Sequence, residues 1–534
     1  MDFGANYRTS KMRQSNVNTQ QDLGSWGISN PRDVSQLAGS LIQEFCLACA
    51  FNDFEPNQTG AGLTAFRANA IDLYEAMSPF YVGRGNAVGI TGQNNNRVDE
   101  DIWAVYGQVT WKGELGGREA SMVAGVRYER TEVDSTSLIR RPRAVVWTAD
   151  NDFRIDTTSD FQPVDGKGSY NNLLPALDFQ VEVMEDVIAR ASYSRTIARP
   201  DYGNLFAAVT AQAPNRPIAN GAVPLGTSGN PDLQPLVSDN FDLSVEWYYK
   251  PGSFLSAGFF EKRVNNFVGT GTVRRPLFDL RDPSSGQAGT RSGQAVALLN
   301  AVGADRTDVN LFTATALIIQ NGGNVAAAQT QFQANRTVLP GGGLGDLNQA
   351  FVDQILASID IEPNASDPLL SFQVAQPINT RAAKIWGFEV AGSHFFGETG
   401  FGVAGAYTFV DGDVGFDIGS DPGQDQFALL GLSDTANVTL IYEKYGVSAR
   451  VAWNWRDKFL TQLNRGGSRN PVFVEAFSQV DFNVSYDINE RLAVSVEGLN
   501  ILEESMRTHA RDPNQLWFAQ ELDSRYLVGV RYKF

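Results

Sequence analysis

Tyr526-Leu-Val-Gly-Val-Arg-Tyr-Lys-Phe534 ends this chain, and it alternates apolar with small or charged side chains before closing on an aromatic ring. Successive side chains of a strand point to opposite faces. One face therefore carries Tyr526, Val528, Val530, Tyr532 and Phe534. A strand that separates lipid from a watery interior needs this division. An ordinary amphipathic edge strand is the alternative interpretation of these nine residues.

Composition excludes several classes of protein. The chain has 534 residues, 51 Gly and 22 Pro, and 11% of it is aromatic. Its mean hydropathy is negative and no apolar run approaches 18 residues, so a helical membrane protein is excluded. Membrane barrels escape this test, because only every second residue of a strand needs to be apolar. The net charge of −17 argues against a nucleic-acid partner.

Cys46 and Cys49 are the two cysteines of the chain. The only histidines, His394 and His509, lie far away, which leaves no four-ligand zinc site, and no βαβ setting supports a redox CxxC. We therefore predict a local disulfide in the exposed loop of an exported protein. Met1–Arg8 lacks the basic start and apolar stretch of a signal peptide, so either the protein is not exported or an upstream part is missing.

Alternating segments recur along the whole chain and predict about fourteen strands of an all-β fold. They are Phe3–Met12, Trp103–Trp111, Met122–Glu129, Leu173–Val183, Val187–Arg195, Phe241–Trp247, Phe254–Val268, Ala383–Phe395, Phe401–Asp411, Asn437–Tyr442, Val447–Arg456, Val480–Asp487, Leu492–Glu497 and Tyr526–Phe534. A soluble sandwich would also have one apolar and one polar face. Aromatic residues at the strand ends, such as Trp247 and Trp453, favour the girdles of a membrane barrel instead.

The connections between these strands help to distinguish a membrane barrel from a soluble sandwich, because short turns alternate with long links. Residues 13–96 and 271–375 are predicted as the two longest loops. The first has helical spacing at Val34–Phe45, and the second at Ala295–Ala301, Asn310–Ile319 and Leu347–Ile359. Transmembrane barrels have tight turns on the periplasmic side and long loops outside. The pattern therefore predicts a transmembrane antiparallel β-barrel.

Three passages resemble the barrel part of a TonB-dependent outer-membrane receptor. The first is Tyr170-Asn-Asn-Leu-Leu-Pro-Ala-Leu-Asp178, followed by Ala191-Ser-Tyr-Ser-Arg-Thr-Ile-Ala-Arg-Pro200. The second is Gly229-Asn-Pro-Asp-Leu-Gln-Pro235, followed by Asn240-Phe-Asp-Leu-Ser-Val-Glu-Trp-Tyr248. The third is Val496-Glu-Gly-Leu-Asn-Ile-Leu-Glu-Glu504, before the closing strand. The style is similar to a proteobacterial subgroup often linked to oligosaccharide uptake.

The resemblance implies about 22 strands around a folded plug, and a TonB box through which an energised partner pulls on that plug. About fourteen strands are visible, and nothing before Phe3 supplies the rest. We therefore expect residues 1–534 to be an N-terminally truncated barrel without a plug domain, located in the bacterial outer membrane. The expected partners are outer-membrane lipid, the barrel-assembly machinery that reads the closing strand, and TonB for the full-length parent only.

Enzymatic chemistry has little support, because no nucleophile, base and acid stand together in the sequence and two histidines allow few triads. No cofactor is expected. The expected ligand is a small-molecule nutrient, either an oligosaccharide or, as the alternative, a siderophore. Aromatic rings beside polar groups suit sugars, and the external loops offer Trp147, Trp517, Arg143, Asp150, Asp512 and Asn514. A passive porin and a soluble all-β interaction protein are the other classes that the sequence leaves open.

Overall fold

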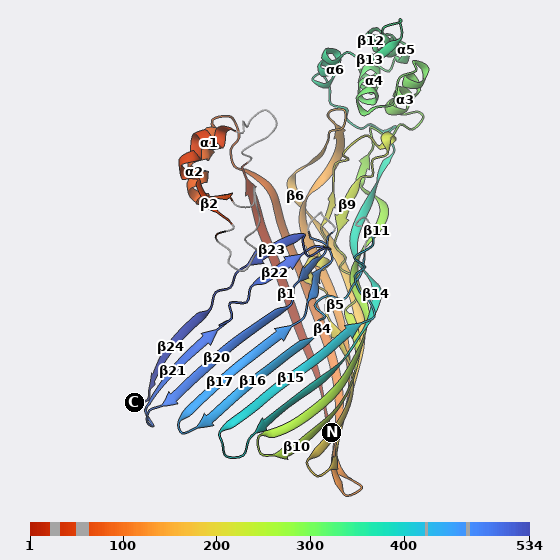
Figure 1. Cartoon of the computed structure of the whole chain (residues 1–534). Coiled ribbons are helices and arrows are strands. Elements are labelled where there is room, and N and C mark those ends of the chain that lie inside the picture. The colour runs from red at the N-terminus through yellow and green to blue at the C-terminus, as the bar shows by residue number, and fades with distance from the viewer. Residues whose placement is uncertain (22–31, 48, 50–63, 422–425, 466–469) are drawn as a thin grey trace.

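The computed structural model describes residues 1–21, 32–47, 49, 64–421, 426–465 and 470–534 (Figure 1). Fourteen strands follow one another in chain order across one curved antiparallel sheet. They are β1 (Asp2–Gln20), β4 (Gly89–Leu115), β5 (Arg118–Trp147), β6 (Phe153–Met184), β7 (Val187–Ala198), β10 (Leu236–Lys250), β11 (Ser253–Arg281), β14 (Leu369–Phe395), β15 (Phe401–Gly412), β16 (Thr435–Lys444), β17 (Val447–Arg456), β20 (Phe477–Asp487), β21 (Leu492–Leu499) and β24 (Arg525–Tyr532). The predicted all-β antiparallel architecture is confirmed.

The two edges of the sheet are β1 and β24. Among the described strands, β1 pairs with β4 and β24 pairs with β21, each along one side only. Figure 1 shows both chain termini at the end of the sheet where the short turns lie. Tight turns such as Gly116–Gly117, whose φ angles are +60° and +78°, need the left-handed region that glycine tolerates.

Several strands run further than the sequence predicts. β5 continues to Trp147 and β6 begins at Phe153, so a link expected to be long is a short loop on a tall hairpin. β1 and β4 likewise shorten the predicted loop 13–96 to residues 21–88, and β11 and β14 shorten 271–375 to residues 282–368. Residues 13–20 of β1 and 89–96 of β4 are mostly polar, so their sequence lacks the apolar alternation from which a strand is recognised. In β14, by contrast, Leu370, Phe372 and Val374 alternate and are buried.

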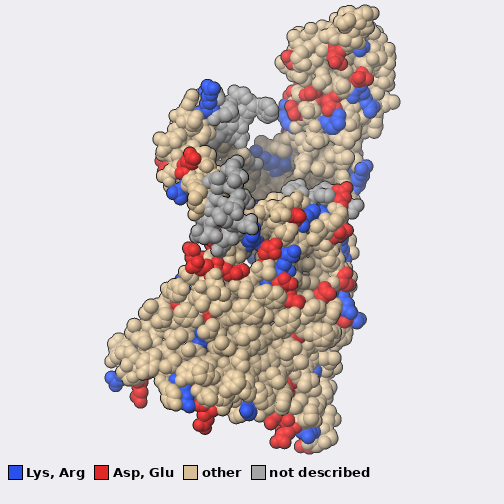
Figure 2. Space-filling model, in the orientation of Figure 1, with Lys and Arg blue, Asp and Glu red and all other residues tan. Residues whose placement is uncertain are grey.

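The two faces of the sheet differ in chemistry. On the apolar face, cross-strand neighbours such as Val484, Val496 and Val528 lie in register, and Val528 is 79% exposed. On the polar face, Asn483 donates a 2.7 Å hydrogen bond to Glu497. Figure 2 shows a broad surface poor in charge over the lower sheet, with charged residues above it and along the turns below.

Charged side chains on the apolar face mark the upper limit of this band. Arg195 lies 2.8 Å from Asp239, and Glu261 lies 2.7 Å from both Arg263 and Lys384. Below them, residues 241–247 of β10 span about 20 Å at 3.3 Å per residue. That height is close to the apolar band of about 25 Å that an outer-membrane barrel presents to lipid.

A helical domain stands above the sheet within residues 282–368 (Figure 1). It contains α3 (Arg291–Ala301), α4 (Asp308–Gln320), α5 (Val325–Ala334), β12 (Arg336–Val338), β13 (Leu344–Leu347) and α6 (Gln349–Leu356). The three helices predicted for this loop are present, and α5 is an additional one. Thr290 and Thr307 cap α3 and α4 by accepting hydrogen bonds from backbone N–H groups. Every residue from Asn310 to Ile318 is buried, so α4 forms the centre of the domain.

Among its described residues, the first long connection has the helices α1 (Arg32–Ala38) and α2 (Ala70–Val82), which pack around Ala38, Met77 and Tyr81. The predicted helix at Val34–Phe45 ends at Ala38 and passes through the 3₁₀ turn η1 (Gly39–Leu41) into β2 (Gln43–Cys46), which pairs with β3 (Thr64–Arg67). Cys46 and Cys49 form a disulfide. Within the described residues, no helix is long and apolar enough to cross a membrane.

Short elements complete the long connections. They are η3 (Tyr202–Leu205), β8 (Val209–Ala211), η4 (Ile218–Asn220) and β9 (Leu225–Ser228) between β7 and β10, and the small sheet of β18 (Phe459–Gln462), β19 (Val472–Val474), β22 (Met506–His509) and β23 (Leu516–Gln520).

Candidate functional site on the polar face

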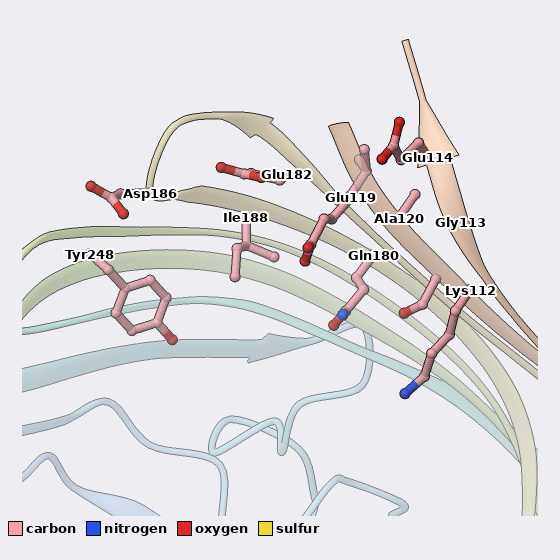
Figure 3. Close-up of a pocket in the computed structure, with 12 residues that line it drawn as sticks. Lys112, Gly113, Glu114, Glu119, Ala120, Gln180, Glu182, Asp186, Ile188 and Tyr248 are labelled. Carbon is pink, nitrogen blue, oxygen red and sulfur yellow. The ribbon is translucent and has the colours of Figure 1, made fainter. Parts of the chain in front are cut away.

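A pocket of about 640 Å³ lies on the polar face near the short turns (Figure 3). We call it the lower pocket. Strand alternation brings its side chains to one face from β4, β5, β6, β7 and β10 and from the turn between β6 and β7. The polar side chains that line it are Lys112, Glu114, Glu119, Ser121, Gln180, Glu182, Asp186 and Tyr248.

The lower pocket is acidic. Four carboxylates line it, against the single lysine Lys112. One of the four, Glu182, has a cation nearby, because the Arg118 guanidinium lies 3.9 Å away. Charges of one sign gathered in a concave surface attract ions of the opposite sign and repel their own. The lower pocket therefore favours cationic groups and disfavours anions.

An ion pair stabilises the wall beside the lower pocket. The Arg190 guanidinium donates two hydrogen bonds of 3.2 Å to the two carboxylate oxygens of Glu246, in a bidentate arrangement. Arg190 also bonds to Gln180, and the Tyr248 hydroxyl donates to Glu246 at 2.8 Å. These contacts link β6, β7 and β10 and fix the side chains that border the pocket.

Higher on the polar face, the connection from β7 to β10 folds back against the wall. We call residues 199–235 the strap. Its buried Leu205 and Leu233 pack against Val98, Val133 and Tyr170 of β4, β5 and β6. These wall residues share the polar face of the sheet, so the strap covers part of that face.

Two buried carboxylates hold the start of the strap. Glu129, 4% exposed, forms ion pairs with Arg199 of the strap and, at 2.9 Å, with Arg127 of its own strand. Glu100, 2% exposed, accepts a 3.1 Å hydrogen bond from the Tyr202 hydroxyl. Buried carboxylates need such partners, because an unpaired charge is costly away from water.

Glycines allow the end of the strap to approach the wall. A Cβ atom on Gly168 of β6 would lie 2.0 Å from the Pro231 carbonyl oxygen. A Cβ on Gly229 would lie equally close to the carbonyl oxygen of Phe206 within the strap. Any larger residue at either position would displace backbone, so Gly168 permits the strap to dock on the wall and Gly229 permits close packing within the strap.

The strap also reaches β14. Asn379 accepts a hydrogen bond from the Gln234 N–H at 2.8 Å and donates one to the Gln234 carbonyl oxygen at 2.9 Å. β9 pairs in parallel with residues 373–375 of β14. The strap is therefore bound at both sides, between the tall β5–β6 and β11–β14 hairpins, which favours a fixed element over a mobile loop.

The structure corrects one predicted ligand-contact residue. Trp147 is 0% exposed, because its ring stacks on Phe153 and meets Phe312 edge-on at 5.1 Å. Its indole N–H donates to the Asp150 carbonyl oxygen at 3.2 Å. Trp147 anchors the helical domain to the β5–β6 hairpin, and a ligand would have to unfold that core to reach it.

The other predicted contacts lie in two separate places. Arg143 is exposed on β5, and Asp150 lies in the following loop. Asp512 and Asn514 are exposed in the turn between β22 and β23. Trp517 is partly buried, with the Arg465 guanidinium 4.4 Å above its ring. Within the described part of the chain, no hydrogen bond joins the two places, and these five residues remain predictions.

The described residues contain no group of three or more His, Cys, Asp or Glu side chains that could hold a metal ion. What the polar face offers is an acidic pocket below and a strap fixed across the wall above. This arrangement suits a passage lined with polar groups.

A family model described as "TonB dependent receptor-like, beta-barrel" matches residues 2–501. The chain belongs to this family. TonB-dependent receptors are outer-membrane transporters rather than enzymes, and the strap, the lower pocket and the helical domain are therefore parts of a receptor barrel. The predicted family is confirmed.

Solved structures of TonB-dependent receptors are similar at low identity. The siderophore receptor PirA from Acinetobacter baumannii matches with a TM-score of 0.45 and 11% sequence identity. The aligned region covers 84% of this chain and 57% of the PirA chain. A mutant of the ferric enterobactin receptor PfeA from Pseudomonas aeruginosa, in complex with enterobactin, has a TM-score of 0.42 and 10% identity, covering 83% and 59%. The receptor barrel thus spans less than two thirds of these proteins. No curated protein matches its sequence.

Proposed function

We propose that this receptor barrel is the membrane-spanning part of an outer-membrane importer for a scarce nutrient, powered through TonB. The observation that carries the proposal is the division of the sheet between an exposed apolar face and a polar face with paired charges. In this proposal, the apolar face contacts lipid and the polar face lines the route of the ligand.

The long connections form the ligand-capturing surface in this scheme. The strap narrows the route, because it is bound to β5, β6 and β14 by the contacts described above. The family's plug and TonB box belong to the full-length receptor in this proposal, and the pull of TonB on the plug would open the route. The acidic lower pocket would face the plug.

For the nutrient, we propose an oligosaccharide. The support is the resemblance of the three quoted passages to the subgroup associated with such ligands. For assembly, we propose that the barrel-assembly machinery recognises β24 and Phe534, whose apolar side chains are exposed along one face.

The proposal is tested in the bacterium that encodes the protein. Deletion of the full-length gene should abolish high-affinity uptake of one oligosaccharide, and loss of TonB should have the same effect. The protein should fractionate with the outer membrane and migrate faster on a gel when it is not heated. Recovery from the soluble fraction, or uptake that persists without TonB, would contradict the proposal.

A further inference from the structure

A second pocket, of about 420 Å³, lies between the upper parts of β4, β5 and β6 and strand β8 of the strap. We call it the upper pocket. Its volume is in the range of about 300–1,000 Å³ that is usual for small-molecule sites. The strap forms one side of it through residues 208–211, so the wall contacts that fix the strap also fix the shape of the pocket.

The upper pocket presents hydrogen-bonding groups that no other part of the described chain occupies. Gln93, Asn94 and Thr157 line it, are exposed, and have no side-chain hydrogen bond to the described residues. Each amide offers both donors and an acceptor, and the hydroxyl offers both as well. Such groups match the hydroxyl groups of a ligand, which also donate and accept.

An aromatic ring and a guanidinium complete the lining. The Cζ atom of Arg140 lies 5.1 Å from the centre of the Phe161 ring, so the two side chains form one platform. The ring offers an apolar surface for C–H groups, and the guanidinium N–H groups remain donors at its edge. A pyranose ring has both an apolar C–H face and a rim of hydroxyl groups.

The upper pocket differs in charge from the lower pocket and from the chain as a whole. The chain has a net charge of −17, and four carboxylates line the lower pocket. Among the described residues that line the upper pocket there is no carboxylate and no lysine, and Arg140 is the one charged side chain. One cation does not balance a ligand of several negative charges, so a neutral ligand fits this lining best.

We propose that the upper pocket binds a neutral, hydroxyl-rich ligand of the saccharide class, with Asn94 bonding its hydroxyl groups and Phe161 contacting its ring. The inference deepens the proposed function and rests on it for the transport of that ligand. Binding itself is a separate property and is measured without transport.

The experiment uses the detergent-solubilised full-length receptor and an array of neutral oligosaccharides, with ferric siderophores and acidic oligosaccharides as competing probes. We expect binding to at least one neutral oligosaccharide. Asn94→Leu should weaken that binding about three- to tenfold, which corresponds to the loss of one hydrogen bond. Asn95→Leu is the matched control, because Asn95 is the adjacent exposed residue of the same type and does not line the pocket.

Phe161→Ala provides an independent variant and should weaken binding about tenfold. Each variant must keep heat-modifiable migration, which shows that its barrel has folded. Equal effects of Asn94→Leu and Asn95→Leu, binding only to ferric siderophores or acidic sugars, or no binding on the array would each overturn the inference. If no array member binds but TonB-dependent uptake of another nutrient is found, the proposed importer role stands and the proposed nutrient and this inference both fail.

Discussion

Val484 and Asn483 are neighbours on β20 whose side chains point to opposite faces of the sheet. Val484 pairs with Val496 on the apolar face, whereas Asn483 bonds to Glu497 at 2.7 Å on the polar face. Val484→Arg should destabilise the folded barrel by about 2–4 kcal/mol, because a charge at this depth would face hydrocarbon. The free energy of unfolding in lipid vesicles, from denaturant titration, measures this effect.

Asn483→Arg is the control for this substitution. Arginine at that position would point into the polar interior beside Glu497, so the cost should stay below about 1 kcal/mol. Equal destabilisation by the two variants would show that the assignment of the two faces is wrong.

Substitution of Arg199 should destabilise the strap as well as remove one ion pair. Arg199→Ala would leave the buried Glu129 with Arg127 as its remaining cation. We expect a loss of about 2–3 kcal/mol and faster proteolysis within the strap, because a buried carboxylate loses part of its compensation. Arg130→Ala is the comparison, since the Arg130–Glu132 pair is more than half exposed and should contribute under about 1 kcal/mol. Proteolysis of the strap at the wild-type rate in Arg199→Ala would contradict the role assigned to it.

At the scale of an element, the position of the strap depends on Gly168. In Gly168→Ala, the new methyl group would lie 2.0 Å from the Pro231 carbonyl oxygen, so strap or wall must move. We expect a loss of about 1–3 kcal/mol, as for other overpacked contacts. Gly203→Ala places its methyl group in open space and should be close to neutral. Thermal unfolding of both variants measures the difference, and an unchanged Gly168→Ala protein would argue against tight docking.

Asp282 is a buried carboxylic acid that lies where β11 ends and the helical domain begins. Burial raises the pKa of Asp282 from 3.8 to about 6, against the hydrogen bonds from the Ser284 hydroxyl and N–H, while nearby Asp367 raises it further. Below about pH 4 this carboxyl is protonated in both the folded and unfolded states. As the pH rises towards about 6, the unfolded state loses the proton first, so the stability of the domain should fall and then level off.

Asp282→Asn should remove this dependence and stabilise the helical domain above pH 6 by about 1–3 kcal/mol, since one pKa unit corresponds to about 1.4 kcal/mol. Hydrogen exchange of residues 291–356 between pH 4 and pH 8 measures the effect. Asp305→Asn, an exposed change in the same domain, is the control. A pH profile identical in the Asp282→Asn variant and the wild type would exclude Asp282 as its source.

At the scale of the whole molecule, assembly should depend on the final ring. Phe534 is fully exposed beyond the end of β24 and contacts Tyr532 edge-on at 5.3 Å. Phe534→Ala in the full-length receptor should reduce the heat-modifiable form several-fold, because the proposed assembly signal is lost. Phe518→Ala, at another exposed ring in β23, should not. Normal insertion of the Phe534→Ala protein would refute the signal.

The fold class and the family follow from the residues without any coordinates. Alternation of apolar and polar residues is a local property, and in strands such as β20 and β24 it follows from the bilayer, which requires one apolar face. The fourteen strands of the main path follow their order in the chain, whereas β9 of the strap pairs in parallel with β14. The first two motifs, including Gly229–Pro235, lie within the matched residues 2–501, and the third begins within them.

The tertiary structure alone decides where the connections lie and which of their side chains come into contact. The partner of Arg199 is 70 residues away, and Gly168 meets Pro231 through a backbone contact that leaves no pattern in the sequence. Trp147 is predicted from the sequence as a loop aromatic, yet it is buried by helices that follow much later in the chain. In the upper parts of the strands, buried side chains such as Val133 and Phe372 pack against distant connections, so contacts far apart in the sequence fix the structure there.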